Sequence, residues 1–343
     1  MEISINYSTI LPMLDICNKI KTGSFCNDDI NNILEADDYI FEFSRYSEKI
    51  TKEEFIDYLT HVTNINDDDI KNISLKMHHS NYKDLFNNLD FYYEKAKQLP
   101  TLLKKEVFQQ QIVLASKGLP SDINLDRLKF IFTIGIGPSF GYVYDNCMHF
   151  DFLHLCRDTS VEELCSSLAH EIHHIGMGKI LDKINMDKMS LEEIFYLHFA
   201  GEGLAVKYCN NAEGVISRHI YNDYINLGLD KFTWDYLNND FDNTFNRFKK
   251  VITDIRSGSI QTQNDLMKEL QDYWMTLYIS KSNSSNIPEL KHFRLYSFGN
   301  DIWGIIHDCY GKDVVFDTLS NINKFPDIYN SAVSKIGRYD LVI

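Results

Sequence analysis

The sequence predicts an α+β fold that is mostly helical. The chain has six prolines in 343 residues, and apolar residues recur at helical spacing over long stretches. One segment, Lys129–Gly135, is instead short, apolar and rich in β-branched and aromatic residues, which predicts a buried strand. Hydrophobic residues make up 44% of the chain, so a sizeable core can be buried. This composition excludes a disordered or fibrous protein.

Helices are predicted along the first 122 residues. Residues 10–20 carry an apolar stripe at helical spacing. Thr51 and Glu54 have the spacing of a capping box, which predicts a helix that begins there and runs to about Val62. Residues 82–98 and 102–116 predict two further helices on either side of Leu99-Pro100. Residues 1–122 are therefore expected to form a helical N-terminal region.

Strands come next, and helices follow them to the end of the chain. Residues 141–144 and 148–153 predict two strand segments after Lys129–Gly135. In residues 148–153 apolar and polar side chains alternate, which predicts one buried and one more polar face. The polar stretch 281–288 is the clearest linker. Residues 123–343 are expected to form a second region with a helical C-terminal part, or to continue the first region as one domain.

Charge and cysteine usage narrow the partners and the compartment. The 34 basic and 49 acidic residues give a net charge of −15, and such a surface repels nucleic acids and anionic membranes. Seven cysteines, an odd number without a CxxC pair, indicate reduced thiols. The sequence shows neither a secretory signal nor an apolar run long enough to span a membrane. We therefore expect a cytoplasmic protein, whose oligomeric state the sequence does not indicate.

The segment with the clearest chemical meaning is the HExxH motif formed by His170, Glu171 and His174. On a helix, positions 170 and 174 project from the same face one turn apart, so both imidazoles can reach one metal. Zinc suits two imidazoles and leaves room for a carboxylate and a water. Glu171 is expected beside that water, where its carboxylate can accept a proton.

The surroundings of the motif support a helix. Ser160 and Glu163 have capping-box spacing, and an apolar stripe runs from Val161 to Ile175. Gly176 and Gly178 are expected to end this helix. The alternative is a polar surface helix whose histidines are incidental.

A catalytic zinc needs a third protein ligand, and the predicted helix 191–208 carries two candidates. Glu193 follows His174 by 19 positions, but Ser190 and Glu193 also have capping-box spacing. Glu202 lies among small apolar residues, where an unpaired charge is costly to bury and a metal would offset that cost. The glycines on both sides of Glu202 permit close approach of another helix. We favour Glu202 and keep Glu193 as the alternative.

These motifs resemble those of the gluzincin clan of zinc metallopeptidases, through His170–His174 and the segment Ala200–Ala205. The chain is more closely similar to an uncharacterised bacterial family of zinc-dependent peptidases. That likeness extends over residues 129–329 and includes the segments Tyr296–Gly299, Tyr310–Lys312 and Phe325–Tyr329.

The resemblance implies a zincin-like fold with a small sheet beside the HExxH helix. It also implies one zinc per chain, held by His170, His174 and Glu202, with Glu171 as catalytic base. The GxMEN signature of some aminopeptidases is absent, and the spacing between His174 and Glu202 exceeds the commonest one. Exopeptidase specificity is therefore not carried over.

Supporting roles are open to several other residues. A donor to the developing oxyanion is expected from the C-terminal half, with Tyr296 as first choice and His292 and His307 as alternatives. Tyr296 is placed just before a helix that runs from Asn300 to Tyr310. His198, one turn before Glu202, either approaches the metal or has a structural role, and the structural role is the commoner one. His173 is expected to be solvated. In the strand region, His149, Asp151 and His154 either line a substrate cleft or belong to a solvated strand face.

The expected activity is hydrolysis of peptide bonds by a metal-activated water with Glu171 as general base, so the substrate is a peptide or a protein. One alternative is a catalytically inactive protein that binds zinc and peptides. The other is a metal-dependent hydrolase of non-peptide amides or esters. The sequence does not indicate the cleavage specificity.

Overall fold

The computed structural model describes residues 2–45, 50–144, 147–157, 161–210, 214–216, 229–278 and 289–343. Ser160 of the expected capping box and the linker 281–288 lie outside these residues. The chain divides into two compact units, unit 1 with Met1–Gln110 and Leu125–Cys165, and unit 2 with Gln111–Asn124 and Ser166–Ile343. The division into a region 1–122 and a region 123–343 stays a prediction, because units defined by contacts need not be domains that fold independently.

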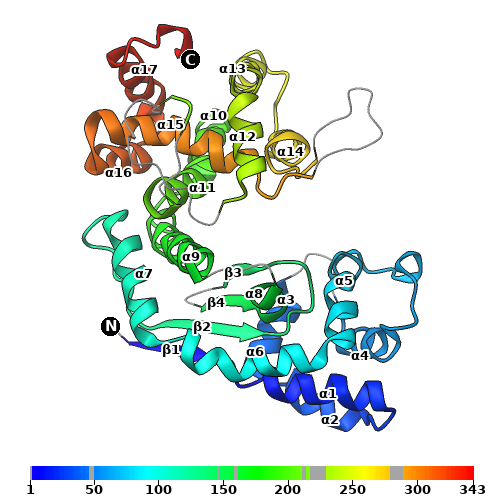
Figure 1. Cartoon of the computed structure of the whole chain (residues 1–343). Helices are drawn as coiled ribbons and strands as arrows, with labels where there is room; N and C mark the ends of the chain where they lie inside the picture. The colour runs from blue at the N-terminus through cyan, green and yellow to red at the C-terminus, as the bar shows by residue number, and fades with distance from the viewer. Residues whose placement is uncertain are drawn as a thin grey trace. The chain divides into compact units, whose positions relative to one another are not determined.

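Unit 1 is built on a four-stranded mixed sheet (Figure 1). Its strands are β1 (Ile3–Asn6), β2 (Leu128–Thr133), β3 (Gly141–Tyr144) and β4 (Cys147–Asp151), in the order β1-β2-β4-β3. β2 pairs in parallel with β1 and β4, and β3 pairs antiparallel with β4. β4 is buried along its whole length, since a central strand is covered on both faces. Polar His149 and Asp151 do alternate with Met148 and Phe150, but both are buried, so the alternative of a solvated strand face is wrong.

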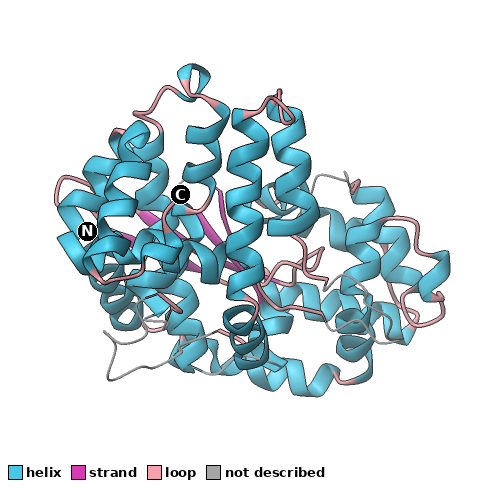
Figure 2. Cartoon of the chain, turned by 90° about the horizontal axis from the view of Figure 1, so that it is seen from above, coloured by secondary structure: helices cyan, strands magenta, loops and turns pink. Residues whose placement is uncertain are grey.

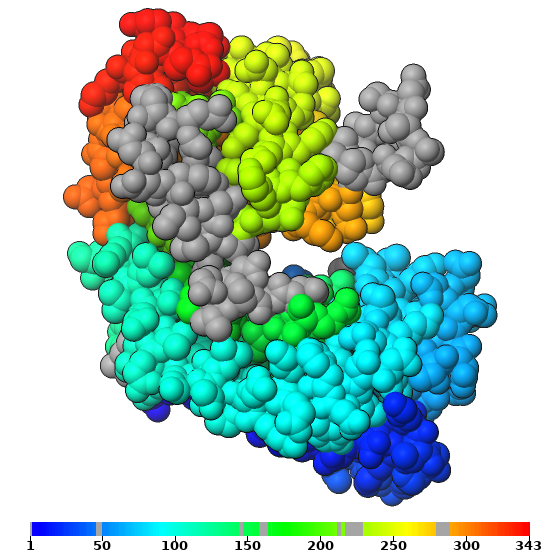
Figure 3. All heavy atoms as spheres, viewed as in Figure 1, coloured from blue at the N-terminus to red at the C-terminus, as the bar shows by residue number. Residues whose placement is uncertain are grey.

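Helices cover both faces of the sheet. Phe108 of α7 packs edge-on against Phe130 and Phe132 of β2, and the cyan atoms of α6 and α7 dominate the visible face of unit 1 in Figure 3. From α3, the Tyr39 hydroxyl donates to the carbonyl of Ile134. Two helices, α7 (Lys105–Lys117) and α9 (Val161–Leu181), have residues in both units. The α-helices that lie within unit 1 are α1 (Ile10–Thr22), α2 (Asn27–Leu34), α3 (Asp37–Arg45), α4 (Lys52–His61), α5 (Ile73–Asn87), α6 (Leu89–Leu102) and α8 (Phe152–Arg157).

Unit 2 is helical in its described residues and is organised around α15 (Arg294–Tyr310), which is buried from Arg294 to Ile306 apart from Tyr296. An aromatic core of Phe199, Phe248 and Trp274 packs against Phe298 of this helix. In Figure 3 the yellow-green atoms of α12 and α13 cover much of the visible face of unit 2. The other elements are α10 (Leu191–His198), α11 (Ala200–Ala205), α12 (Lys231–Asn239), α13 (Phe241–Arg256), α14 (Gln263–Glu269), α16 (Lys312–Ser320), α17 (Phe325–Lys335) and two π-helical turns, Val206–Asn210 and Leu270–Trp274.

The predicted fold class is confirmed: the described chain is mostly helical with one small sheet, whose strands are magenta in Figure 2. The strands expected near 129–135, 141–144 and 148–153 are present as β2, β3 and β4. The helix expected from the Thr51 cap is α4, and Thr51 accepts a hydrogen bond from the Glu54 backbone N–H. No helix in the described ranges is long and apolar enough to cross a membrane.

Three local predictions are wrong. The N-terminal region is not all helical, because β1 lies in it and joins the sheet. The helix expected over 82–98 is interrupted at Asn88, which ends α5 and precedes α6, and Pro100 lies in the last turn of α6. The HExxH helix does not end at Gly176. A Cβ there would lie 2.1 Å from a methyl carbon of Leu119, so this glycine allows close packing within unit 2 instead.

Candidate metal centre

Helix α9 presents the two outer histidines of the HExxH motif on one face. His170 and His174 lie one turn apart, and their ring centroids are 4.6 Å apart. The Nε2 atom of His170 lies 3.0 Å from Oε2 of Glu202, and Nε2 of His174 lies 3.3 Å from the same oxygen. Both imidazoles therefore direct the same ring nitrogen toward one carboxylate.

A glycine contact between two helices brings Glu202 and Tyr296 into the same neighbourhood. A Cβ on Gly203 of α11 would lie 2.2 Å from the carbonyl carbon of Gly299 of α15, so the two backbones touch there. Glu202 precedes this contact on α11, and Tyr296 lies one turn before it on α15. The expected close approach of a helix is correct for Gly203 and wrong for Gly201, where a Cβ would meet nothing within 4 Å.

A π-helical turn adds Asn210 to the site. Asn210 follows Glu202 by eight residues, and on an ideal α-helix its side chain would point roughly 80° away from that of Glu202. The wider π-turn Val206–Asn210 reduces this angle. Oδ1 of Asn210 lies 2.8 Å from Nδ1 of His170. We assign the proton to Nδ1, which donates to the amide oxygen, so that Nε2 is the free ligand atom.

The charges of the site fit a bound cation. The Nε2 lone pair of His170 and a carboxylate oxygen 3.0 Å apart repel each other unless a cation or a proton lies between them. Burial lowers the pKa of His174, but the carboxylates of Glu202 and Glu171 outweigh burial and raise it to about 9. Burial raises the pKa of Glu202, and the two histidines overcome this and hold it well below its usual range. Two imidazole nitrogens and one carboxylate oxygen are a donor set that zinc takes in catalytic sites.

Glu171 and Tyr296 lie beside these residues. Glu171 is half-buried, and its charge acts on both His174 and Tyr296. The Tyr296 ring stacks on His170, with centroids 5.4 Å apart and planes 11° apart, and its hydroxyl donates to Glu202. Burial, with added repulsion from both carboxylates, raises the pKa of Tyr296 well above 10, so the hydroxyl keeps its proton. Tyr296 was expected before a helix, but it lies inside α15, which begins at Arg294.

Glu193, the alternative third ligand, has a structural role. Its Oε2 accepts from the Ser190 backbone N–H at 2.7 Å, and its own N–H donates to Ser190 Oγ at 3.3 Å. This capping box begins α10, and Glu193 does not join the cluster of His170, His174 and Glu202. The structure therefore brings Glu202 to the two histidines and leaves Glu193 at a helix end.

The other candidate histidines differ in their distance from the site. The ring of His292 stacks on Tyr296, with centroids 5.6 Å apart, and burial lowers its pKa to about 4, so it is neutral near pH 7. His307 lies three turns after Tyr296 on α15, and its Nδ1 is 2.9 Å from the hydroxyl of Tyr208. Of the two alternatives to Tyr296, only His292 is adjacent to it.

Two further histidines of unit 2 are held by backbone carbonyls. Nδ1 of His198 donates to the carbonyl of Ile194 at 2.8 Å, which gives this histidine a structural role. His173 is fully buried, and its Nε2 lies 3.2 Å from the carbonyl of Gly118. The prediction that His173 is solvated is therefore wrong.

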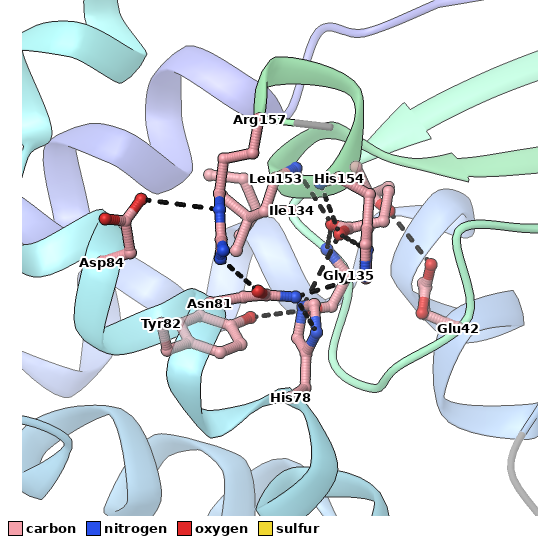
Figure 4. A network of polar contacts seen from close by, with 12 residues as sticks. Glu42, His78, Asn81, Tyr82, Asp84, Ile134, Gly135, Leu153, His154 and Arg157 are labelled. Atoms are coloured by element: carbon pink, nitrogen blue, oxygen red, sulfur yellow. Dashed lines mark hydrogen bonds and ion pairs between the residues drawn. The ribbon is translucent and has the colours of Figure 1, made fainter. Parts of the chain in front are cut away.

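Sequence reasoning missed two features. No local pattern marks Asn210, because its role depends on a π-turn and on a contact with a residue 40 positions away. The second feature is a cluster of His78, Asp151 and His154 in unit 1, whose ligand-type atoms are close enough to hold a metal (Figure 4). Asp151 and His154 have helical spacing in the sequence, but His78 comes from α5. Asp151 is buried, so these residues do not belong to a solvated strand face.

Comparison with known families agrees with a metal site. The model of the family DUF5700, described as "Putative zinc dependent peptidase", matches residues 30–337, which is most of the chain. Among curated proteins and among solved structures, no significant match was found. The family match confirms the resemblance to a family of zinc-dependent peptidases.

Proposed function

The chain belongs to this zinc-peptidase family, and on that basis we propose that it hydrolyses peptide bonds at a site formed by His170, His174 and Glu202. One zinc per chain, a peptide or protein substrate, a cytoplasmic location and a zincin-like arrangement of the gluzincin type are parts of this proposal. The observation that supports it most directly is the convergence of two Nε2 atoms on one oxygen of Glu202.

Zinc fits this donor set and, when bound, supplies a Lewis acid that polarises a carbonyl oxygen and makes water more acidic. Asn210 holds the His170 ring in the orientation that a ligand needs, because its amide oxygen accepts the proton on Nδ1. The stacked ring of Tyr296 limits rotation of the same imidazole. These contacts reduce the conformational entropy that the His170 side chain loses when zinc binds.

Glu171 is the general base of the proposal. Its carboxylate accepts a proton from the attacking water and then donates it to the amine nitrogen that leaves. The position directly after His170 keeps it within one turn of both histidines. Tyr296 keeps its proton at neutral pH, so its O–H can turn from Glu202 to the developing oxyanion of the substrate.

The test is Glu171→Gln, with Glu193→Gln as the matched control. We expect Glu171→Gln to keep its zinc and to lose peptide hydrolysis by about 10²- to 10⁴-fold, the usual contribution of general acid–base catalysis. Glu193→Gln keeps a side-chain acceptor at the start of α10, outside the metal cluster, and is expected to keep full activity. Zinc content is measured by elemental analysis and hydrolysis with a peptide library.

Three outcomes contradict the proposal. Full activity of Glu171→Gln would exclude this residue as the base. Binding of peptides without turnover of any would favour an inactive zinc- and peptide-binding protein. Turnover of small non-peptide amides or esters alone would favour the other hydrolase alternative.

A further inference from the structure

Unit 2 contains an apolar pocket that the proposed catalytic residues do not form. Its volume is about 540 Å³, within the range of about 300–1,000 Å³ that is usual for ligand sites. Leu197 and Leu266 are buried, whereas Met186 is 45% exposed. The pocket is therefore accessible from solvent and has an apolar interior. Its apolar lining consists of Leu181, Met186, Ile194, Leu197, Leu266 and Met267.

Two of the helices that line this pocket, α9 and α11, also carry the proposed metal ligands. Gly201, which lines the pocket, directly precedes Glu202, and His198 lies one turn before Glu202. Leu181 ends α9 seven residues after His174, which is two helical turns or roughly 10 Å along the axis. An extended peptide advances about 3.3 Å per residue. The pocket thus lies within about three residues of a bond held at the metal site.

The lining favours a large apolar side chain. Most of the lining residues are aliphatic or methionine, and the acidic side chain that also lines the pocket, Asp187, disfavours an acidic ligand. Gly201 adds to the space, because a Cβ at this position would meet nothing within 4 Å. The glycine is not required by a positive φ, since it lies within helix α11. Its absent side chain therefore leaves volume in the pocket.

We propose that this pocket binds a large apolar side chain of the peptide substrate, such as Leu, Met or Phe, within about three residues of the scissile bond. This inference rests on the proposed peptidase function and names the substrate class of that same site. Burial of such a side chain strengthens binding by about ten- to a hundredfold over alanine, from the transfer free energy of its apolar surface.

The test uses one variant that fills the pocket and another that enlarges it. Gly201→Leu places a side chain in the open space, and the substitution replaces a helical glycine with a better helix former, so folding is expected to be retained. Met267→Ala enlarges the pocket, and Met275→Ala, at a methionine of unit 2 that is not among the lining residues, is the matched control. Thermal unfolding of each variant checks the fold.

Two readouts separate the pocket from the catalysis. The first is the cleavage profile of a peptide library, read by mass spectrometry, in the wild type and the three variants. The second is the affinity of two labelled peptides, which differ by Phe against Ala at one position, for the Glu171→Gln protein with and without Gly201→Leu. We expect the wild type to prefer a large apolar side chain, Gly201→Leu to remove that preference, and Met275→Ala to keep it. Met267→Ala is expected to shift the preference toward bulkier side chains.

The outcomes distinguish the two proposals. Cleavage without a preference for large apolar side chains, or a preference that Gly201→Leu leaves unchanged, would overturn the pocket proposal and leave the peptidase function in place. Tighter binding of the Phe peptide that Gly201→Leu removes, without cleavage of any peptide, would support the pocket and overturn the peptidase function. Equal binding of the Phe and Ala peptides would overturn the pocket proposal even if no peptide is cleaved.

Discussion

The described residues contain two clusters of two histidines and one carboxylate, His78, Asp151 and His154 in unit 1 and His170, His174 and Glu202 in unit 2. The ligand-type atoms of each cluster lie within 4.8 Å of one another, so distance alone does not separate them. They differ in what each imidazole nitrogen and each carboxylate oxygen already contacts.

In unit 1 most hydrogen-bonding atoms of the cluster are engaged within the protein (Figure 4), while Nε2 of His78 lies 3.7 Å from Oδ2 of Asp151, beyond hydrogen-bond distance. Asp151 accepts from the backbone N–H groups of Gly135 at 2.8 Å and His154 at 3.1 Å, and from Nδ1 of His154 at 2.6 Å. The amide nitrogen of Asn81 lies 2.9 Å from Nδ1 of His78 and 3.3 Å from Nε2 of His154. Arg157 donates to the amide oxygen of Asn81, which fixes the amide with its N–H groups toward both rings.

In unit 2 the orientation of the asparagine is the opposite. The oxygen of Asn210 accepts from Nδ1 of His170, and both Nε2 atoms face the same oxygen of Glu202. The amide of Asn81 donates to the ring nitrogens that face away from Asp151, so the proton of each ring stays on the nitrogen that faces this carboxylate. The amide of Asn210 instead keeps the His170 proton on Nδ1 and leaves the Nε2 lone pair available toward Glu202. The two clusters have the same residue composition, so the direction of the imidazole lone pairs decides which cluster suits a metal.

The largest expected effect is on zinc content. His174→Ala is expected to weaken zinc binding by about a hundred- to a thousandfold, because one of three protein ligands is lost. His154→Ala is the matched control, since the side chains of His174 and His154 are 22% and 24% exposed. Elemental analysis and competition with a chelator measure the result. Two zinc ions per wild-type chain, or loss of zinc in His154→Ala, would contradict the contrast between the clusters.

The second expected effect concerns pH and stability in unit 1. Burial, followed by the charge of Asp151, raises the pKa of Glu42 from 4.5 to about 7. Glu42 is therefore protonated in the folded state at a pH where it is ionised in the unfolded chain. Its contribution to stability is complete below about pH 4.5 and is lost as the pH rises to about 7, by about 3 kcal/mol in total.

Glu42→Gln tests this dependence, because glutamine does not titrate. In metal-free protein, the free energy of unfolding of the variant relative to the wild type is expected to rise between about pH 4.5 and pH 7. Metal-free protein is used so that loss of zinc at low pH does not contribute. A difference between the two proteins that stays constant over this pH range would show that Glu42 is already ionised in the folded state.

The smallest expected effect separates the two asparagines. Asn210→Ala is expected to weaken zinc binding by about ten- to a hundredfold, the usual effect of removing an acceptor that orients a histidine ligand. Asn210→Asp keeps an acceptor for Nδ1 of His170 and is expected to restore binding. Asn81→Ala is the control, with unchanged zinc affinity and lower stability. Equal zinc affinity of Asn210→Ala and the wild type would mean that Asn210 has a structural role only.

Several elements of the fold were predictable because their signals are local. The caps at Thr51 and Ser190 begin helices as expected, since a side-chain oxygen that accepts from an N–H three residues later acts within one turn. Strand β1 was not predicted. Its partner β2 lies about 125 positions away, and a strand of four residues is too short to show a clear alternation of apolar and polar side chains. The break at Asn88 was also missed: asparagine favours helix ends, but the side chain of Asn88 makes no cap hydrogen bond to α6, and no capping box marks the start of that helix.

For the candidate site, the sequence by itself determined the pair His170 and His174 and the position of Glu171, because four residues complete about one turn of any α-helix. It also indicated Glu202 through the cost of burying a charge. Only the tertiary structure decided which nitrogen of His170 faces the carboxylate, that Tyr296 stacks on it, and that Gly201 opens into a pocket. These features depend on where α11, its π-turn and α15 cross at Gly203 and Gly299, and helical period carries no information about contacts between distant segments.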